Sequence, residues 1–343
     1  MNVTKDGLKN RQLHIEDYLQ MVSAEQKEYA EVFSHQRITE NNDIITDFQT
    51  DNLMEQILHK DNLNKAYKKV KSNKGAGGID GMSVEELLGY LRNNQEQLIQ
   101  KLKDGKYKPN PVRRVEIPKE TKGGFRKLGV PTVVDRVFQQ AITQVLSPIY
   151  EKQFSENSFG FRPDRGAHDA LKQCQTNVND GYVYVVDMDL EKFFDTVCQS
   201  KLIEVLSRTI KDGRVISLIH KYLNAGVISR GIFEKTEVGM PQGGPLSPLL
   251  SNIMLNELDK ELTRRGHRFV RYADDCMIFC KSRKSAERTL NNIVPYVEGK
   301  LFLKVNRTKT CVAHISRVKY LGYSFYRYKG TCRFRVHPKS VIK

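Results

Sequence analysis

Two separate segments end an apolar run in aspartates, and these carboxylates are the side chains best suited to chemistry. YVYVVDMD carries Asp187 and Asp189, and YADD carries Asp274 and Asp275. Buried acids are costly unless they are paired or bound to a metal. Carboxylate oxygens suit Mg²⁺, and two such ions can activate a hydroxyl and stabilise a leaving pyrophosphate. We therefore expect phosphoryl transfer, against the alternative that these acids are solvated turn or cap residues.

The charge of the chain favours a polyanionic partner. Its 343 residues include 56 Lys and Arg against 40 Asp and Glu, a formal net charge of +16, although residues 1–50 are acidic. Residues 101–136 are the most basic segment, with 11 Lys or Arg and four acids. Such a charge favours nucleic acid first and an anionic membrane second. We find no basic amphipathic helix with apolar anchors that would support the membrane alternative.

Composition places the chain among soluble, reduced proteins. Hydrophobic residues make up 39% of the chain, which is enough for a buried core. No run approaches the roughly 18–20 apolar residues of a membrane helix, and the N-terminus lacks the apolar core of a secretory signal. The six cysteines form no CxxC pair, so we expect free thiols and a cytoplasmic location.

Apolar patterns predict the elements that must position the aspartates. Residues 182–189 are predicted to form a strand buried on both faces, and residues 267–282 a hairpin with Asp274 and Asp275 at its bend. Mixed strands and helices without strict alternation predict an α+β fold. The other predicted strands are 112–119 and 124–131, with a hairpin at 319–336; the predicted helices are 63–74, 135–150, 201–226, 249–262 and one from about residue 192.

Longer motifs carry a specific resemblance. YADD, DLEKFFD and GMPQGGPLSPLLSN have the order and spacing typical of reverse transcriptases. NKGAGGIDGM, YKPNPVRRVEIPK, RKLGVPTVVDRVFQQAI, SFGFRPDRGAHDAL and KYLGYSFY extend a pattern that resembles group II intron-encoded reverse transcriptases, also called maturases. The resemblance covers residues 52–343. It implies the fingers and palm of a right-hand polymerase, an α+β fold whose antiparallel palm sheet packs on helices.

The resemblance also implies a domain organisation. Residues 1–50 would be an acidic extension without a family motif, residues 51–180 the fingers with an RNA-binding N-terminal extension, and residues 181–343 the palm, with a small return to the fingers before residue 239. The thumb, DNA-binding and endonuclease domains of the family are expected to be absent from this chain. Cys198-Gln199-Ser200 departs from the family, which usually has an Asn/Asp-His pair there.

By resemblance, Asp189, Asp274 and Asp275 form the acidic set that holds two Mg²⁺ ions, for which Mn²⁺ can substitute. Spacing alone does not choose between Asp187 and Asp189, because alternate residues of a strand share a face. The family match selects Asp189 and leaves Asp187 a structural role. The carbonyl of Leu190 is a further expected metal contact.

The resemblance assigns dNTP contacts as well. Lys119 and Arg126 would grip the triphosphate, and Arg114 is a further candidate for the same face of the basic hairpin. Phe194 would exclude a 2′-hydroxyl and so select deoxynucleotides, against the alternative of an ordinary core phenylalanine. Further implied dNTP contacts are Gln242 and Gly243 in the loop under the nascent base pair, and Lys309, which would protonate the leaving pyrophosphate.

RNA and primer contacts follow from the same resemblance. They comprise Lys65, Lys68, Lys69 and Lys71 in the fingers extension, Arg114, and Tyr320, Leu321 and Gly322 in a primer-gripping hairpin. Aromatic strand packing is the alternative explanation for most of the nearby tyrosines. Lysines of this kind supply salt-dependent phosphate contacts without reading sequence.

The implied function is that of an RNA-directed DNA polymerase of a bacterial group II intron, which adds dNTPs to a primer 3′-hydroxyl on an RNA template. Intron RNA binding, splicing and retrohoming are implied by resemblance alone. The expected partners are an RNA template, a DNA or RNA primer, intron RNA and dNTPs, with no membrane. A defence- or retron-type reverse transcriptase is disfavoured by the basic segment 63–81. A domesticated splicing cofactor without polymerase activity is disfavoured by the intact aspartates.

Overall fold

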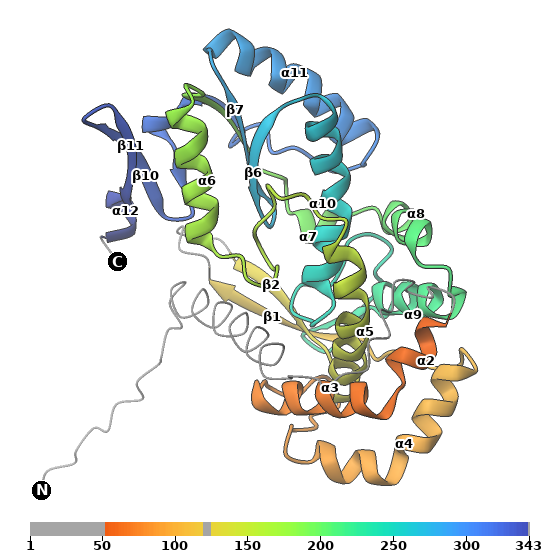
Figure 1. Cartoon of the computed structure of the whole chain (residues 1–343). Coiled ribbons are helices and arrows are strands. Elements are labelled where there is room, and N and C mark those ends of the chain that lie inside the picture. Colours follow the sequence, from red (N-terminus) through yellow and green to blue (C-terminus); the bar gives the residue numbers. More distant parts are fainter. Residues whose placement is uncertain (1–51, 119–124, 342–343) are drawn as a thin grey trace, which may run out of the picture.

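The computed structural model describes residues 52–118 and 125–341, with helices and strands interspersed along the chain (Figure 1). The helices are α2 (Leu53–Ile57), α3 (Lys60–Ser72), α4 (Leu87–Lys103), α5 (Val133–Glu151), α6 (Ala167–Asn179), α7 (Phe193–Thr196), α8 (Gln199–Thr209), α9 (Gly213–Leu223), α10 (Ser247–Arg264), α11 (Arg283–Gly299) and α12 (Pro338–Val341). The strands are β1 (Val112–Pro118), β2 (Phe125–Val130), β3 (Tyr184–Met188), β4 (Val227–Ser229), β5 (Ile232–Glu234), β6 (Arg268–Tyr272), β7 (Asp275–Cys280), β8 (Cys311–His314), β9 (Lys319–Tyr320), β10 (Tyr323–Tyr328) and β11 (Thr331–Val336). The predicted α+β fold is confirmed.

A four-stranded antiparallel sheet in the order β6-β7-β3-β8 forms the centre of the molecule. Strand β3 pairs on both edges and is covered on both faces, and its burial on both faces explains the nearly continuous apolar run of its sequence. Val186 and Ile278 point into the core shared with α10 and α11, whereas Val185 and Met277 point into a second core with α6 and Phe325 of β10. Helices and the small β9–β11 sheet therefore cover its two faces (Figure 1).

A second sheet in the order β2-β1-β4-β5 lies between the central sheet and the helices α3 and α5 (Figure 1). Strands β1 and β2 form the predicted basic hairpin, and β4 joins β1 in parallel. The chain thus returns to this sheet after β3 and before residue 239. Ala66 and Val70 of α3 are buried, and α3 packs along α5.

Two predicted elements differ from the structure. The helix expected over residues 201–226 is two helices, α8 and α9, because Asp212 interrupts it and accepts the backbone N–H of Arg214 at the start of α9. The same Asp212 carboxylate accepts a hydrogen bond from the backbone N–H of Met54. The helix expected from residue 192 lasts only from Phe193 to Thr196.

Several predicted features fall on residues that the structure does not describe. They are the acidic extension 1–50, Lys119 and the turn 120–124. Between residues 52 and 118 and between 125 and 341, no helix has the length and apolar character needed to cross a membrane.

Candidate active site

Strand register brings the three predicted aspartates together at one edge of the central sheet. Met188 of β3 lies opposite Cys276 of β7, and the same register continued by one residue sets Asp189 opposite Asp275. Paired Cα atoms in antiparallel strands lie about 5 Å apart. Asp274 occupies the adjoining turn, because Tyr272 pairs with Asp275 in the β6–β7 hairpin.

Burial, with a smaller contribution from neighbouring carboxylates, raises the pKa values of Asp187, Asp274 and Asp275. Burial raises the pKa of Asp275 to about 7, and the charges of Asp274, Asp187 and Asp189 add to this effect. Burial also raises the pKa of Asp274, with Asp189 adding and Arg126 partly offsetting the shift. Burial followed by the charge of Asp189 raises the pKa of Asp187 to about 6. Burial and the neighbouring carboxylates therefore both oppose ionisation of Asp275 at this site.

Lys309 is the cation that directly contacts this cluster. Its Nζ lies 3.1 Å from Oδ2 of Asp189 and 3.4 Å from Oδ1. No three Asp, Glu, His or Cys side chains converge as metal ligands within the described residues. The residue types nevertheless suit a hard divalent cation, because the carboxylates of Asp189, Asp274 and Asp275 lie near enough to interact electrostatically and a cation bound between them would reduce their repulsion.

The loop before β8 fixes the backbone of Asp189. The N–H of Asp189 donates to Oγ1 of Thr310 at 3.1 Å, and its carbonyl accepts the N–H of Asn306 at 2.9 Å. The neighbouring Leu190 is buried and bridges to Val305. The metal contact expected of the Leu190 carbonyl stays a prediction.

A fully buried arginine supports the turn that carries Asp274. Nη1 of Arg271 donates to the carbonyl of Ala273 at 2.8 Å and to Oδ1 of Asn252 at 3.0 Å. Nη2 donates to Oδ2 of Asp259 at 2.6 Å and to Oγ of Ser158 at 2.7 Å. Ala273 has a φ of 53°, a left-handed conformation that a non-glycine residue rarely adopts. The Arg271 network therefore connects a strained turn to α10 and to the loop before α6.

The SFGFRP motif packs directly under this turn. The N–H of Phe159 donates to the carbonyl of Arg271 at 2.9 Å, and Asn252 donates to the carbonyl of Gly160 at 2.8 Å. A side chain at position 160 would overlap the backbone nitrogen of Ala273. The motif resemblance gave Arg271 and Gly160 no individual role. The sequence shows a glycine inside SFGFRP and an arginine directly before YADD. Their roles depend on contacts that only the tertiary structure reveals.

Phe194 lies on the short helix α7, five residues after Asp189 along the chain. Its half-buried ring meets that of Phe193 edge to face, with centroids 5.3 Å apart. The N–H of Met240 donates to the Phe194 carbonyl at 2.7 Å, and that of Gly239 donates to the Val197 carbonyl at 2.8 Å. The position of Phe194 is thus tied to the Gly/Pro loop that follows β5.

The same loop reaches the basic hairpin. The carbonyl of Gln242 accepts the N–H of Gly129 in β2 at 2.7 Å. Gly243 has a φ of 125°, and a Cβ at this position would lie 2.8 Å from the Gly129 carbonyl oxygen. A Cβ at Gly244 would overlap the side-chain oxygen of Gln139. Glycine is therefore required at positions 243 and 244, where the loop passes close to β2 and α5.

One expectation for the basic hairpin is wrong. Arg126 pairs with Ile117 across the hairpin, and Arg114 pairs with Gly129. Because Arg114 is three residues from Ile117, it points to the other face of the sheet from Arg126. Arg126 is close enough to Asp274 to lower its pKa, whereas Arg114 does not share that face.

The lysines of α3 are separated from the aspartates by the basic sheet. Lys65, Lys68 and Lys71 are exposed, and Lys69 is half-buried. The GAGGIDG loop after α3 is held by two arginines that the sequence did not distinguish from surface charges. Arg113 donates to the carbonyl of Gly77 at 2.8 Å, and Arg136 donates to that of Ala76 at 2.6 Å.

The predicted primer-gripping residues form the turn between β9 and β10. Leu321 and Gly322 both have positive φ angles, of 49° and 85°. The side chain of Tyr320 is buried in the core beside α6, and its hydroxyl donates to the Val270 carbonyl at 3.5 Å. Burial of Tyr320 supports the alternative of strand packing for that residue, whereas Leu321 and Gly322 are half-buried and their contact with a primer stays a prediction.

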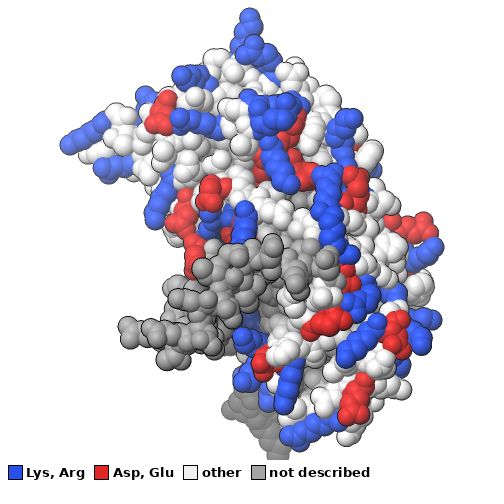
Figure 2. Space-filling model, turned by 45° about the vertical axis from the view of Figure 1, so that its right-hand side comes forward, with Lys and Arg blue, Asp and Glu red and all other residues white. Residues whose placement is uncertain are grey.

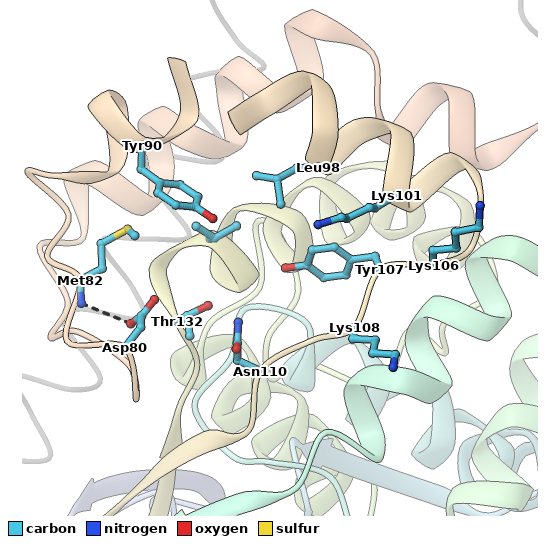
Figure 3. Close-up of a pocket in the computed structure, with 11 residues that line it drawn as sticks. Asp80, Met82, Tyr90, Leu98, Lys101, Lys106, Tyr107, Lys108, Asn110 and Thr132 are labelled. Carbon is cyan, nitrogen blue, oxygen red and sulfur yellow. Dashed lines mark hydrogen bonds between the residues drawn. The ribbon is translucent and has the colours of Figure 1, made fainter. Parts of the chain in front are cut away.

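A cavity of about 290 Å³ lies between α4 and the start of α5 (Figure 3). Tyr90 and Lys101 point into it from α4, and Asp80, Asn110 and Thr132 face them. None of the four aspartates described above lines this cavity, so it is separate from the carboxylate site.

Comparisons with known proteins agree with this geometry. Residues 117–325 match the family model described as reverse transcriptase (RNA-dependent DNA polymerase). The chain is 31% identical over 364 residues to group II intron-encoded protein LtrA of Lactococcus lactis subsp. cremoris, a match that covers 87% of this chain and 60% of LtrA. It is 34% identical over 304 residues to protein YkfC of Escherichia coli (strain K12), covering 77% of this chain and 80% of YkfC.

A solved structure shares the fold at lower identity. Apo telomerase from Candida tropicalis aligns with a TM-score of 0.51 and 14% identity, covering 69% of this chain and 52% of that chain. The likeness supports the α+β arrangement around the central antiparallel sheet. The chain spans about 60% of the length of LtrA.

The raised pKa of Asp275 predicts a pH-dependent stability. Between about pH 4, its unfolded value, and pH 7, the metal-free native state binds more protons than the unfolded chain, so the free energy of unfolding falls as pH rises. In EDTA, Asp275→Asn should therefore raise Tm above wild type at pH 8, and the difference should shrink toward pH 4. Thermal melts across this range measure the effect. Glu96→Gln, on the exposed surface of α4, is the control and should not change the profile.

Breaking the buried ion pair should destabilise the palm. Arg271→Met leaves Asp259 buried without its partner, and we expect a loss of about 3–5 kcal/mol in the free energy of unfolding measured in urea. Arg271→Met combined with Asp259→Leu should recover part of this loss, because no unpaired charge remains. The exposed pair on α11 provides a control, since Arg283→Met should cost less than about 1 kcal/mol. Wild-type stability of Arg271→Met would contradict the structural role.

Proposed function

We propose, since the chain belongs to the reverse transcriptase family, that it is the RNA-directed DNA polymerase and maturase of a group II intron. The observation that supports the proposal is the strand register, which sets Asp189 opposite Asp275 and leaves Asp274 in the adjoining turn. Residues 51–180 would act as fingers and residues 181–343 as palm, with a return to the fingers before residue 239. Its bacterial relatives support a bacterial host and a cytoplasmic site of action.

The reaction would add a deoxynucleotide to a primer 3′-hydroxyl. Enzymes of this family generally use divalent metals such as Mg²⁺, which activate the hydroxyl and stabilise the leaving pyrophosphate when bound. Asp189, Asp274 and Asp275 would hold two Mg²⁺ ions, or Mn²⁺ in their place. The Asp189 carboxylate is within reach of Lys309, so the ammonium group would be available beside the leaving pyrophosphate.

The surroundings of the aspartates would orient the dNTP. Arg126 extends from the basic hairpin toward Asp274, where its guanidinium would bind triphosphate oxygens. Phe194 would lie under the sugar, and the loop of Gln242 and Gly243 would lie under the nascent base pair. Because hydrogen bonds connect this loop to both Phe194 and β2, the sugar and base contacts would be positioned together.

Intron RNA binding and a role in splicing and retrohoming complete the proposal. The similarity to the group II intron-encoded protein LtrA supports this role. The exposed lysines 65, 68 and 71 lie on one side of α3, where they would contact RNA phosphates without reading sequence.

Removing one carboxylate should separate polymerisation from RNA binding. Asp274→Ala should abolish extension of a primer on an RNA template, because the carboxylate would hold metal and make no contact with RNA. The affinity of the variant for the same template, measured by filter binding, should match wild type. A titration with Mg²⁺ should raise the Tm of wild type and have a smaller effect on the variant. Robust extension by Asp274→Ala would refute the proposed site.

The sugar-selecting role of Phe194 has its own test. Phe194→Val removes the ring that would exclude a 2′-hydroxyl, so the ratio of dNTP to rNTP incorporation should fall about tenfold or more. Single-nucleotide primer extension with each substrate measures this ratio. Phe194→Tyr keeps the ring and should retain the wild-type ratio. An unchanged ratio in Phe194→Val would show that the ring packs in the core without selecting the sugar.

A further inference from the structure

The C-terminal part of the chain carries an unbalanced positive charge. Residues 299–343 contain 12 Lys and Arg and no Asp or Glu. Of these basic residues, only Arg307 and Lys309 form ion pairs within the parts of the chain that the structure describes. Seven of the other ten lie in or next to the small β9–β11 sheet: Arg317, Lys319, Arg327, Lys329, Arg333, Arg335 and Lys339.

The β10–β11 hairpin is firmly attached through its inner face. Phe325 and Cys332 are buried, and they belong to the core shared with α6. Nε2 of Gln175 in α6 donates to the Cys332 carbonyl at 2.5 Å, and the Cys332 N–H donates to Oδ1 of Asn179 at 2.7 Å. The hairpin is therefore a fixed platform that projects from the body of the molecule beside α6 (Figure 1).

Its outer face carries alternating tyrosines and arginines. Tyr326 lies opposite Arg333, and the neighbouring pairs of this face are Ser324 with Arg335 and Tyr328 with Thr331. The guanidinium of Arg333 lies 4.8 Å from the ring centroid of Tyr328, and that of Arg335 lies 5.3 Å from that of Tyr326.

These side chains are accessible at the tip of the hairpin. Tyr328 is 48% exposed, and Arg333 and Arg335 are exposed. Lys329, in the turn, adds a further cation 5.7 Å from the Tyr328 ring. Lys and Arg side chains cover the tip of the projection at the upper left of Figure 2, where the hairpin lies. The inner face already anchors the hairpin, so the outer tyrosines and arginines are not needed for its core.

We propose that the outer face of the β10–β11 hairpin binds single-stranded nucleic acid, at a site separate from the catalytic aspartates. Arginine stacked on a tyrosine ring is held in place while its N–H groups remain free to bind phosphate oxygens. The tyrosine faces supply stacking surfaces for unpaired bases, a combination typical of single-strand binding. Residues two apart on one face are about 7 Å apart, so the two arginines would contact different phosphates of an extended strand.

This site goes beyond the proposed polymerase function. The tip of the hairpin lies about 17 Å along β10 from the β9–β10 turn that was expected to grip the primer. The hairpin would hold a strand that has left, or has not yet reached, the catalytic turn. The chemistry is shared by RNA and DNA, and the experiment distinguishes them.

The test measures binding in EDTA without dNTPs, so its result is independent of polymerase activity. Fluorescence anisotropy follows a short oligo(U) and a short oligo(dT) over a series of salt concentrations. Arg333→Gln with Arg335→Gln should weaken binding and make the slope of log affinity against log salt shallower by about 1.4, or about 0.7 per phosphate. Lys284→Gln with Arg288→Gln removes the same charge from the exposed surface of α11 and should have a smaller effect.

Stacking is tested separately from charge. Tyr328→Ala should lower the affinity about fivefold or more with the salt slope unchanged, whereas Tyr328→Phe keeps the ring and should bind as wild type. If these variants bind oligo(U), oligo(dT) or both more weakly than wild type, the result supports the site and shows whether it binds RNA, DNA or both. Wild-type binding by the Arg333 and Arg335 double variant overturns the proposal, as does an equal loss in the α11 control. Weakened binding to anionic vesicles with both oligonucleotides unaffected would assign the face to membranes and would also overturn it.

Discussion

Buried carboxylates at one end of the central sheet are held close together because the β6–β7 turn that carries Asp274 is fixed by a buried hydrogen-bond network. Burial, and after it the charges of neighbouring carboxylates, raises the pKa values of Asp187 and Asp275 at the ends of β3 and β7. The turn between them contains a left-handed Ala273 and is fixed by the buried Arg271, which bonds Asp259, Asn252 and Ser158. A turn with a single anchor could relax and separate the charges. The network removes that freedom and preserves a site in which a divalent cation is electrostatically favoured.

The positions around the aspartates are coupled through backbone contacts. The Gly/Pro loop of residues 239–244 accepts or donates hydrogen bonds at both of its ends, to the short helix α7 and to β2 of the basic hairpin. Its glycines pass so close to neighbouring groups that side chains would not fit. The loop therefore connects α7, which follows Asp189 along the chain, to β2 of the basic hairpin.

Basic side chains lie both next to the aspartates and on surfaces further away from them. Arg126 and Lys309 act on the aspartates directly, as the shift in the pKa of Asp274 and the Lys309–Asp189 ion pair show. Exposed lysines of α3 and the tyrosine–arginine face of the β10–β11 hairpin lie further out. Such a distribution suits a polymer that approaches from several directions and is processed at one point.

The sequence by itself determined which chemistry was possible. Apolar periodicity and turn residues located β3, the β6–β7 hairpin and the β10–β11 hairpin, because each depends on local pattern. Residue type restricted the site to hard carboxylate ligands beside basic groups. Long motifs in order identified the family.

The tertiary structure decided how these parts contact one another. Only register could set Asp189 opposite Asp275 and Arg114 on the face away from Arg126, since a one-residue shift reverses every side chain of a strand. Arg271 looked like one more basic residue until burial gave it four partners from three segments. Pattern is a property of neighbours along the chain, whereas burial, register and charge coupling arise between residues that folding alone brings together.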